Sequence, residues 1–384
     1  MRAGAARRAG LLAPLVAVSL VACQGLPGTG TTAPAVMRVS PDGSGECTPS
    51  SPCRLETAIA RAGSGTRIEL GDGDYGDIRI DGGSRYGDFA EPVVIAPAGE
   101  AAPRIAGLRT STPSIRLEDL TIAGLLSFDD GADGGQAVRV HVTGSGMFAR
   151  ADHLRVIDSL FEGGSSIDGI QIAGASDVLV EGTTVRDYDQ EIDNGRHADC
   201  IQLFDVSDVV LRGNRLSNCY NSGLIISGGG RGIQGLVIEA NFVQGCVVKG
   251  PRCGGGSTAE LREQSVSGLV VRNNTFLNGS VRWGSVAGAV FDRNVVGYLS
   301  DCDAHITNSI VLGWNSKMCR TPASLDTDGN RAGEYTPVDA ASGQLAPVDP
   351  EQVRIQPWGD PKPAKAGIDG TALPADVAGA VAAG

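Results

Sequence analysis

Short apolar runs that alternate with polar residues recur along most of the chain. The run DGIQIAGASDVLVEGTTV, which begins at Asp168, aligns without a gap with DCIQLFDVSDVVLRGNRL, which begins 31 residues later at Asp199. Each run predicts a short strand, a corner rich in Gly, Asn or Asp, and a second short strand. Weaker copies of the second strand end at Val243, Phe276, Val296 and Val311. One such unit cannot bury its apolar side alone, so the pattern predicts coils stacked on a common core.

The stacked coils predict an all-β fold, a single parallel β-helix. One corner position carries Asn in successive coils, where the amides could hydrogen-bond along the stack. These residues are Asn214, Asn241, Asn274, Asn294 and Asn308. A β-sandwich also contains many short strands, but its hairpin turns would not keep Asn at one coil position.

A helix is expected at the N-terminal end of the stack. Leu55, Ala58, Ile59 and Ala62 form an apolar stripe with the i, i+3, i+4, i+7 spacing of an amphipathic helix. Such a helix would cap the first coil, because an uncovered coil exposes strand edges and apolar interior to water.

From about Val36 to Val311 the chain resembles the pectate-lyase-like right-handed β-helix superfamily, and VSPDGSGECTPSSPCRLETAIARAGSGTRIELGDGDY resembles its N-terminal cap. The resemblance implies one right-handed parallel β-helix over residues 36–319. Residues 320–384 are a Pro-, Ala- and Gly-rich tail. Its segment AGIDGTALPADVAGA resembles the closing segment of many such β-helices, so part of the tail could lie back on the body. Disorder is the other interpretation of this composition.

The N-terminus predicts export. Basic residues precede an apolar run from Leu11 to Ala22, whose 12 residues are too few for a membrane-spanning helix of about 20. The run ends in Leu-Val-Ala-Cys, which looks like a lipobox. We therefore expect a lipoprotein signal peptide over residues 1–22, a lipid on Cys23, a flexible linker over residues 23–35, and anchoring to the bacterial membrane or cell surface. An ordinary secretory signal with an incidental Cys is the alternative.

The cysteines agree with export. Eight remain beside Cys23, an even number that favours disulfides in an oxidising compartment. The spacing favours the local pairs Cys47–Cys53 and Cys302–Cys319. It leaves open the pairing of Cys200, Cys219, Cys246 and Cys253. Zinc binding is the alternative, and the lack of CxxC spacing speaks against it.

The charge of the chain restricts its partners. A formal net charge of −12 excludes a nucleic-acid partner, which would need a basic face. An acidic polysaccharide stays open where a local Arg patch or a bound cation reverses the sign. The oligomeric state is open.

The best candidate chemistry lies where the two strongest repeats stack. Strand alternation points Gln202 outward, and Gln171 lies beneath it in the preceding coil. Asp168 and Asp199 stack at the strand entries, and His197 precedes Asp199 by two residues. Amides suit sugar hydroxyls, and a His beside carboxylates suits acid–base chemistry. The structural alternative is that these residues only cap backbone amides and form a ladder.

Two loops adjoin this corner. The first has four acidic residues that could hold calcium, the one cofactor that the sequence suggests, although it departs from the EF-hand pattern and could be a solvated acidic loop. These residues are Asp187, Asp189, Glu191 and Asp193. In the second loop, Lys249 or Arg252 could serve as a lyase base or as a clamp for a substrate carboxylate.

IDGIQIAGASDVLVEG and ADCIQL also resemble the catalytic blocks of polygalacturonases, which would make Asp168 and Asp199 two of that family's catalytic carboxylates. Ala198 stands where the family has another Asp, and Asn221-Ser222-Gly223 stands where it has Gly-His-Gly. The standard polygalacturonase mechanism is therefore not expected.

Together these features predict a surface-tethered polysaccharide lyase or glycoside hydrolase. His197, Asp199 and Asp168 would be catalytic, with His197 as general acid or base. The substrate would be held by Gln171, Gln202, Lys249 and Arg252. The alternative is a non-catalytic glycan-binding or envelope-organising β-helix lipoprotein, because a fold does not by itself imply a reaction.

Overall fold

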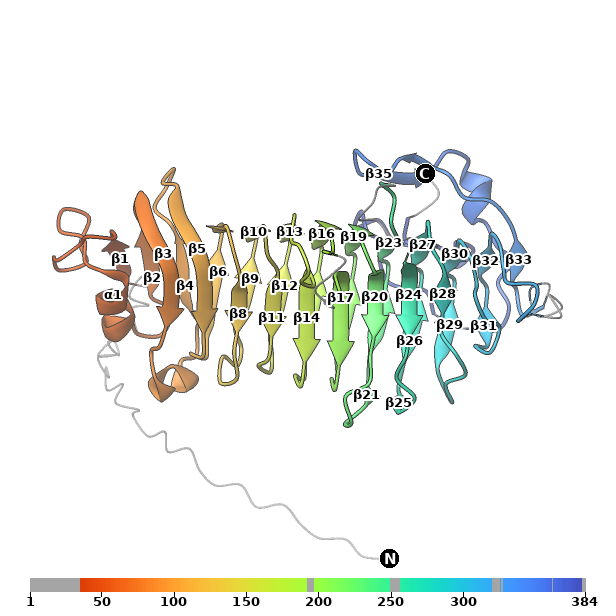
Figure 1. The fold of residues 1–384 in the computed structure, drawn as a ribbon, viewed down its shortest axis with the longest axis horizontal. Coiled ribbons are helices and arrows are strands. Elements are labelled where there is room, and N and C mark those ends of the chain that lie inside the picture. Colours follow the sequence, from red (N-terminus) through yellow and green to blue (C-terminus); the bar gives the residue numbers. More distant parts are fainter. Residues whose placement is uncertain are drawn as a thin grey trace, which may run out of the picture. The chain divides into compact units, whose positions relative to one another are not determined.

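A computed structural model describes residues 35–191, 197–248, 256–319, 325, 327–360 and 362–381. These residues form an all-β solenoid whose parallel strands wind into successive coils (Figure 1), which confirms the predicted fold class. Lys249, Arg252 and Asp193 lie outside the described residues, as do the predicted signal peptide and Cys23.

Each regular coil contributes a strand to each of three rows. The first row is a 12-stranded parallel sheet. Its strands are β1 (Val36–Val39), β2 (Arg67–Leu70), β4 (Val93–Pro97), β6 (Ile115–Glu118), β9 (Gln136–Val138), β12 (Arg155–Ile157), β15 (Leu179–Glu181), β18 (Val210–Arg212), β22 (Val237–Glu239), β26 (Val270–Arg272), β29 (Val290–Asp292) and β31 (Ile306–Thr307).

The second and third rows are joined through the long strands β3 (Gly73–Ile80) and β5 (Pro103–Thr110). The second row holds β7 (Thr121–Ile122), β10 (His141–Thr143), β13 (Leu160–Glu162), β16 (Thr184–Tyr188), β19 (Arg215–Cys219), β23 (Phe242–Gln244), β27 (Thr275–Leu277), β30 (Val295–Val296), β32 (Ile310–Val311) and β33 (Arg331–Ala332). The third row holds β8 (Leu126–Phe128), β11 (Met147–Ala149), β14 (Ile170–Ala173), β17 (Asp199–Phe204), β20 (Ser222–Ile226), β24 (Ser257–Leu261) and β28 (Val281–Arg282).

The alternating pattern of the sequence places apolar side chains inside the coils. In β14, Ile170 and Ile172 are fully buried and pair with Ile201 and Leu203 of β17. Gln171 lies between them and faces the other side of the strand. The remaining elements are the strand pairs β21 (Ile233–Gln234) with β25 (Val266–Ser267) and β34 (Pro337–Asp339) with β35 (Gln344–Pro347), and the 3-10 helices Ser84–Asp88 and Pro350–Val353.

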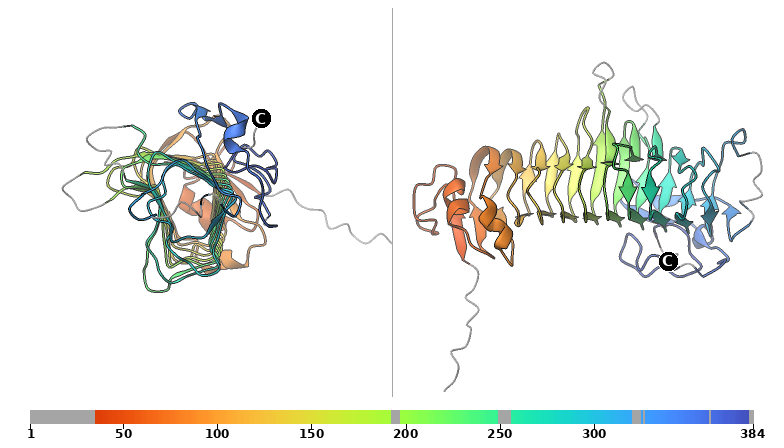
Figure 2. Two further views of the ribbon diagram at one scale, coloured as in Figure 1. Left: turned by 90° about the vertical axis from the view of Figure 1, so that its right-hand side faces the viewer. Right: turned by 90° about the horizontal axis from the view of Figure 1, so that it is seen from below.

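The N-terminal end carries the expected helix, α1 (Leu55–Arg61). Its stripe of Leu55, Ala58 and Ile59 is buried, and Ala62 follows it into the core. Viewed along the axis, α1 lies within the outline of the coils (Figure 2). The helix therefore covers the apolar interior of the first coil. Within the described residues, no helix has the length and apolar character needed to span a membrane.

A buried polar ladder runs along the corner between the first and second rows. Asn241 is typical: its Oδ1 accepts hydrogen bonds from the backbone N–H and the side-chain amide of Asn214, at 2.9 and 3.0 Å. Its Nδ2 donates to Leu211 O at 2.8 Å and to Asn274 Oδ1 at 3.0 Å. Four of the five predicted Asn therefore stack as expected, including Asn294.

The fifth ladder residue was assigned one position too early. Asn294 N–H donates to Ser309 Oγ at 3.0 Å, and Ser309 N–H donates to Asn330 Oδ1 at 2.9 Å. Asn308 instead adopts a left-handed conformation (φ 49°) at the turn residue that precedes the ladder position. Asn tolerates this region better than most residues, so the same residue type suits both adjacent positions.

The outer face of the first row carries arginine–glutamate pairs. Glu239 is bound by Arg212 and Arg272, each at 2.6 Å. Burial alone would raise the pKa of Glu239, but hydrogen bonds from the two arginines outweigh this effect and lower it. Glu239 thus stays ionised although its side chain is only 6% exposed.

The C-terminal segment, described over residues 327–360 and 362–381, lies back on the body (Figure 1). Tyr335, Leu345, Val353 and Val377 form a second hydrophobic cluster against Phe242 and other outward residues of the second row. The guanidinium of Arg293 and the side chain of Thr275 also bond to its backbone. These described residues thus pack on the body, and β33 adds a strand beyond the predicted end of the regular coils.

Two predicted disulfides are present, Cys47–Cys53 and Cys302–Cys319. The open question among the middle cysteines is answered in part, because Cys200 is bonded to Cys219 of the next coil. Cys253 lies outside the described residues.

Candidate functional site

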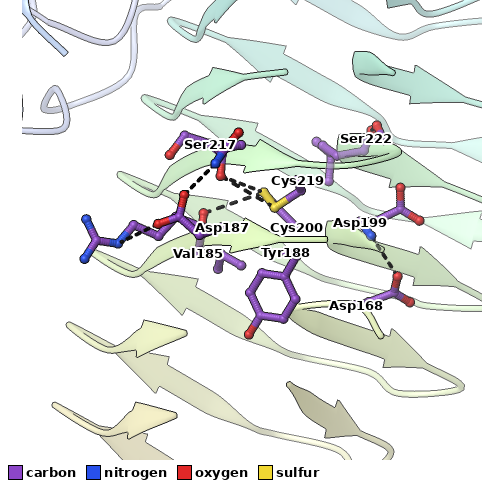
Figure 3. Close-up of a disulfide and its surroundings, with 12 residues drawn as sticks. Asp168, Val185, Asp187, Tyr188, Asp199, Cys200, Ser217, Cys219 and Ser222 are labelled. Carbon is purple, nitrogen blue, oxygen red and sulfur yellow. Dashed lines mark hydrogen bonds and ion pairs between the residues drawn. A yellow bond between two sulfur atoms is a disulfide. The ribbon is translucent and has the colours of Figure 1, made fainter. Parts of the chain in front are cut away.

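Asp168 and Asp199 lie side by side at the start of two neighbouring strands of the third row (Figure 3). The pairing of Ile170 with Ile201 sets this register, as the 31-residue repeat predicts. The backbone N–H of Asp199 donates to Asp168 Oδ1 at 3.0 Å. Their side chains are only 4% and 0% exposed. Two carboxylates are therefore buried together, which requires compensating charge or hydrogen bonds.

His197 supplies that charge. Its Nδ1 lies 2.9 Å from Asp199 Oδ2 and 3.5 Å from Asp168 Oδ1, while 46% of its side chain is exposed. Asp168 first and then Asp199 raise the pKa of His197 to about 10, against the lowering effect of its partial burial. Burial raises the pKa of Asp199. At neutral pH the ring is an imidazolium, which can donate a proton or attract an anion.

His197 Nδ1 and Asp199 Oδ2 form an ion pair at 2.9 Å. Asp199 Oδ2 is buried and has no other hydrogen-bond partner in the described part of the chain. The other oxygen, Oδ1, accepts a hydrogen bond from Asn221 Nδ2 at 2.7 Å. Asn221 occurred in the sequence only as a departure from a catalytic block, so its supporting role was missed.

Gln171 is fully engaged by its neighbours. Its Nε2 donates to Asp168 Oδ2 and to Gln202 Oε1, each at 2.9 Å. Its Oε1 accepts from the guanidinium of Arg150, which also donates to Gln171 O at 2.9 Å. Because it uses one N–H group on Asp168 and the other on Gln202, Gln171 holds Asp168 in place, and its sugar-binding role stays a prediction.

Gln202 faces outward, as alternation predicts, but neighbouring side chains leave it only 7% exposed. Arg150 was not predicted. It comes from the end of β11, and its guanidinium lies 4.9 Å from the ring centre of Phe148 on the outer face of the same strand. No repeat in the sequence marks this coil as part of the site.

Local packing explains why Gly169 and Cys200 stand at equivalent positions. A Cβ on Gly169 would lie 2.2 Å from Val185 Cγ1 and 2.7 Å from Cys200 O, so only glycine fits. In the next coil Cys200 bonds to Cys219 in the buried space beside Asp199 (Figure 3). Tyr188 fills the adjacent space, and its hydroxyl donates to Ser145 O at 2.6 Å. These contacts fix the strand ends that carry the two carboxylates.

The predicted calcium loop has no such convergence in its described residues. Asp187 accepts a hydrogen bond from Asn218 at 2.6 Å and lies 3.6 Å from Arg186. The described part of the chain holds one group of three residues with metal-binding atoms close together, and it consists of Asp168, His197 and Asp199 rather than the loop acids Asp187, Asp189 and Glu191.

Comparison with known proteins supports the fold. Residues 132–316 match the family model of the right handed beta helix region. The structure is similar to a rhamnogalacturonan lyase at 10% identity and a TM-score of 0.51, covering 86% of this chain and 96% of that chain. It is also similar to a PL6 family polysaccharide lyase from Pseudopedobacter saltans, at 14% identity and a TM-score of 0.41, covering 85% of this chain and 97% of that chain. A third similar structure is the pectate lyase Pel9A, at 15% identity and a TM-score of 0.39, covering 73% of this chain and 79% of that chain.

No curated protein matches the chain in sequence. The expected resemblance to pectate-lyase-like right-handed β-helices is confirmed for the fold, whose coils over residues 132–316 include the three charged residues of the site.

Proposed function

We propose that this right-handed β-helix protein acts on a polysaccharide at Asp168, His197 and Asp199. One observation carries the proposal: a half-exposed imidazole ring lies against two buried carboxylates on the outward side of a solenoid. A buried charge cluster that reaches solvent through one titratable ring is a common mark of a functional site. The similarity to a rhamnogalacturonan lyase over 96% of that chain's length supports a polysaccharide as the substrate class.

The geometry favours elimination over hydrolysis by a carboxylate pair. A glycosidase needs one carboxylate to attack the sugar or activate water, and both carboxyl groups must reach the glycosidic bond. Asp168 and Asp199 are buried, and His197 stands between them and solvent. The imidazolium is the group that can reach substrate. In a lyase it would neutralise a uronate carboxylate or protonate the leaving oxygen.

Three roles follow for the named residues. His197 touches the substrate and supplies the positive charge and the proton. Asp168 and Asp199 keep the ring charged and oriented, since Nδ1 faces them and Nε2 is left for the substrate. Lys249 and Arg252 keep their predicted roles as base or carboxylate clamp within this proposal.

Tethering completes the proposal. The lipobox-like sequence before Cys23 supports a lipid anchor, and the linker of residues 23–35 would hold the β-helix near the membrane or cell surface. Such a protein would meet polysaccharides of the cell exterior.

The test is a screen of uronate-containing and neutral polysaccharides with purified protein. Unsaturated products that absorb ultraviolet light are expected; new reducing ends without them would instead indicate a hydrolase. His197→Gln should abolish product formation. His153→Gln is the matched control, because His153 forms an exposed 2.8 Å pair with a single carboxylate, Asp177. Binding without turnover would support the non-catalytic glycan-binding alternative, and neither binding nor turnover would overturn the proposal.

A further inference from the structure

We propose that Asp168, His197 and Asp199 also form a binding site for a divalent cation of the first transition row. The site deepens the proposed function, and it rests on that function only for the identity of the substrate that would meet the cation. One ligand atom from each residue lies within 4.8 Å of the other two. His197 Nδ1 lies 2.9 Å from Asp199 Oδ2 and 3.5 Å from Asp168 Oδ1. Ligands bonded at about 2.1 Å to one cation stand roughly 3 to 3.5 Å apart, so only a small adjustment is required.

A second observation points to a ligand at this position. Asp199 Oδ2 is fully buried, and within the described residues its contact is the ion pair with His197 Nδ1 at 2.9 Å. Because burial keeps water away from this oxygen, one ion pair leaves its desolvation only partly compensated. A cation between the ring and the two carboxylates would compensate it directly.

The surrounding hydrogen bonds prepare the carboxylates for this task. Asp168 Oδ2 is held by Gln171 and Asp199 Oδ1 by Asn221, at 2.9 and 2.7 Å. Each carboxylate thus has one oxygen held by an amide side chain and the other turned toward the ring. Asp168 Oδ1, which is turned toward the ring, also accepts the backbone N–H of Asp199 at 3.0 Å. Supporting contacts of this kind orient ligands in known metal sites.

The ligand set selects the class of cation. One imidazole nitrogen with two carboxylate oxygens suits Mn²⁺ or Zn²⁺, whereas Ca²⁺ prefers six to eight oxygens. Three protein ligands leave coordination positions open on the exposed side of His197, where a sugar carboxylate or hydroxyl could bind. The cation would replace the proton on Nδ1, so either state places positive charge against the same substrate group.

The test is a titration of the metal-stripped protein with Mn²⁺. Electron paramagnetic resonance measures binding as the loss of the signal of free Mn²⁺. One Mn²⁺ per chain is expected, displaced by Zn²⁺. His197→Gln, which alters a half-exposed ring, should weaken binding at least about tenfold, and Asn221→Ala should weaken it roughly 10- to 100-fold through loss of support. His153→Gln should bind like the unmodified protein. Circular dichroism of each variant checks its folding.

Three results would overturn this inference. They are unchanged Mn²⁺ binding in folded His197→Gln, no binding of Mn²⁺ or Zn²⁺ at millimolar concentration, and tighter binding of Ca²⁺ than of Mn²⁺. Its failure can be separated from failure of the proposed function. If the protein binds no Mn²⁺ but still cleaves polysaccharide in the presence of a chelator, only the proposed metal site is refuted. If the protein binds one Mn²⁺ but neither binds nor cleaves any polysaccharide, the proposed function is refuted and the metal site is supported.

Discussion

The charge of His197 can be tested directly in metal-free protein. The two carboxylates beside the ring raise its pKa from the ordinary 6.5 to about 10. Its ring protons should therefore keep the chemical shift of an imidazolium through neutral pH and titrate only in alkaline buffer. Asp168→Asn removes the larger of the two contributions and should lower the pKa of His197 by about one unit or more.

The same shift has a defined effect on stability. Because the pKa of His197 is higher in the folded protein, the stabilisation is fully present below about pH 6.5 and is lost as the pH rises toward 10. One pKa unit corresponds to about 1.4 kcal/mol, but solvent screens a half-exposed ring, so we expect a loss of about 1 to 2 kcal/mol. The difference in unfolding free energy between the unmodified protein and His197→Gln should narrow by this amount over that pH range.

Proton NMR of the four histidines gives the measurement, with the signal that is missing in His197→Gln providing the assignment. Urea unfolding at pH 6 and pH 10 gives the stability difference. If His197 titrates near its ordinary value, the ring is neutral at physiological pH. The acid role would then be refuted, and a base role restored.

Three further predictions concern the scaffold and the anchor. Asn241→Ala removes the partners of the Asn214 N–H and the Leu211 C=O inside the ladder, so urea titration should show an unfolding free energy lower by about 3 to 5 kcal/mol. Asn315→Ala, the control, removes one exposed hydrogen bond and should lower the unfolding free energy by less than about 1 kcal/mol. Equal losses in the two variants would refute the ladder's role. Because the pKa of Glu239 is lowered in the folded protein, its stabilisation is present above the ordinary pKa of 4.5 and is lost as the pH falls below that value. Glu239→Gln should therefore weaken the pH dependence of the thermal unfolding temperature between pH 5 and about 3. The same pH dependence in the variant as in the unmodified protein would contradict this. Cys23→Ala should move the protein from the membrane fraction to the soluble fraction and abolish labelling by a fatty acid, whereas persistent labelling would exclude the proposed anchor.

The repeat made the centre of the site predictable. Asp168 and Asp199 occupy equivalent positions in two gapless copies, and parallel pairing brings equivalent positions together. Gln171 and Gln202 follow from the same register. His197 could be placed beside them because it lies only two residues from Asp199. Its charge state could not be predicted, because burial of the two carboxylates is a property of the assembled coils.

Other features left no periodic signal. Arg150 reaches Gln171 from a neighbouring coil whose sequence lacks the Asp-Gly-Ile-Gln pattern. The C-terminal segment packs through irregular backbone and scattered apolar residues such as Tyr335 and Val377, which neither helical nor strand spacing identifies. The shift from Asn308 to Ser309 in the ladder arose because a turn and a ladder position both accept Asn.

The return of the C-terminal segment along the second row changes how the solenoid should come apart. A simple repeat array can fray from its end, one coil after another, because each coil touches only its neighbours. Here residues 335–360 and 362–381 contact β23, β27, β30 and β32 at once, through the second hydrophobic cluster and the hydrogen bond from Ala380 N–H to Thr275 Oγ1. The last coils should consequently open as one cooperative block, and only after this segment has detached. In hydrogen exchange, amides from β23 to β32 would then share a single opening free energy.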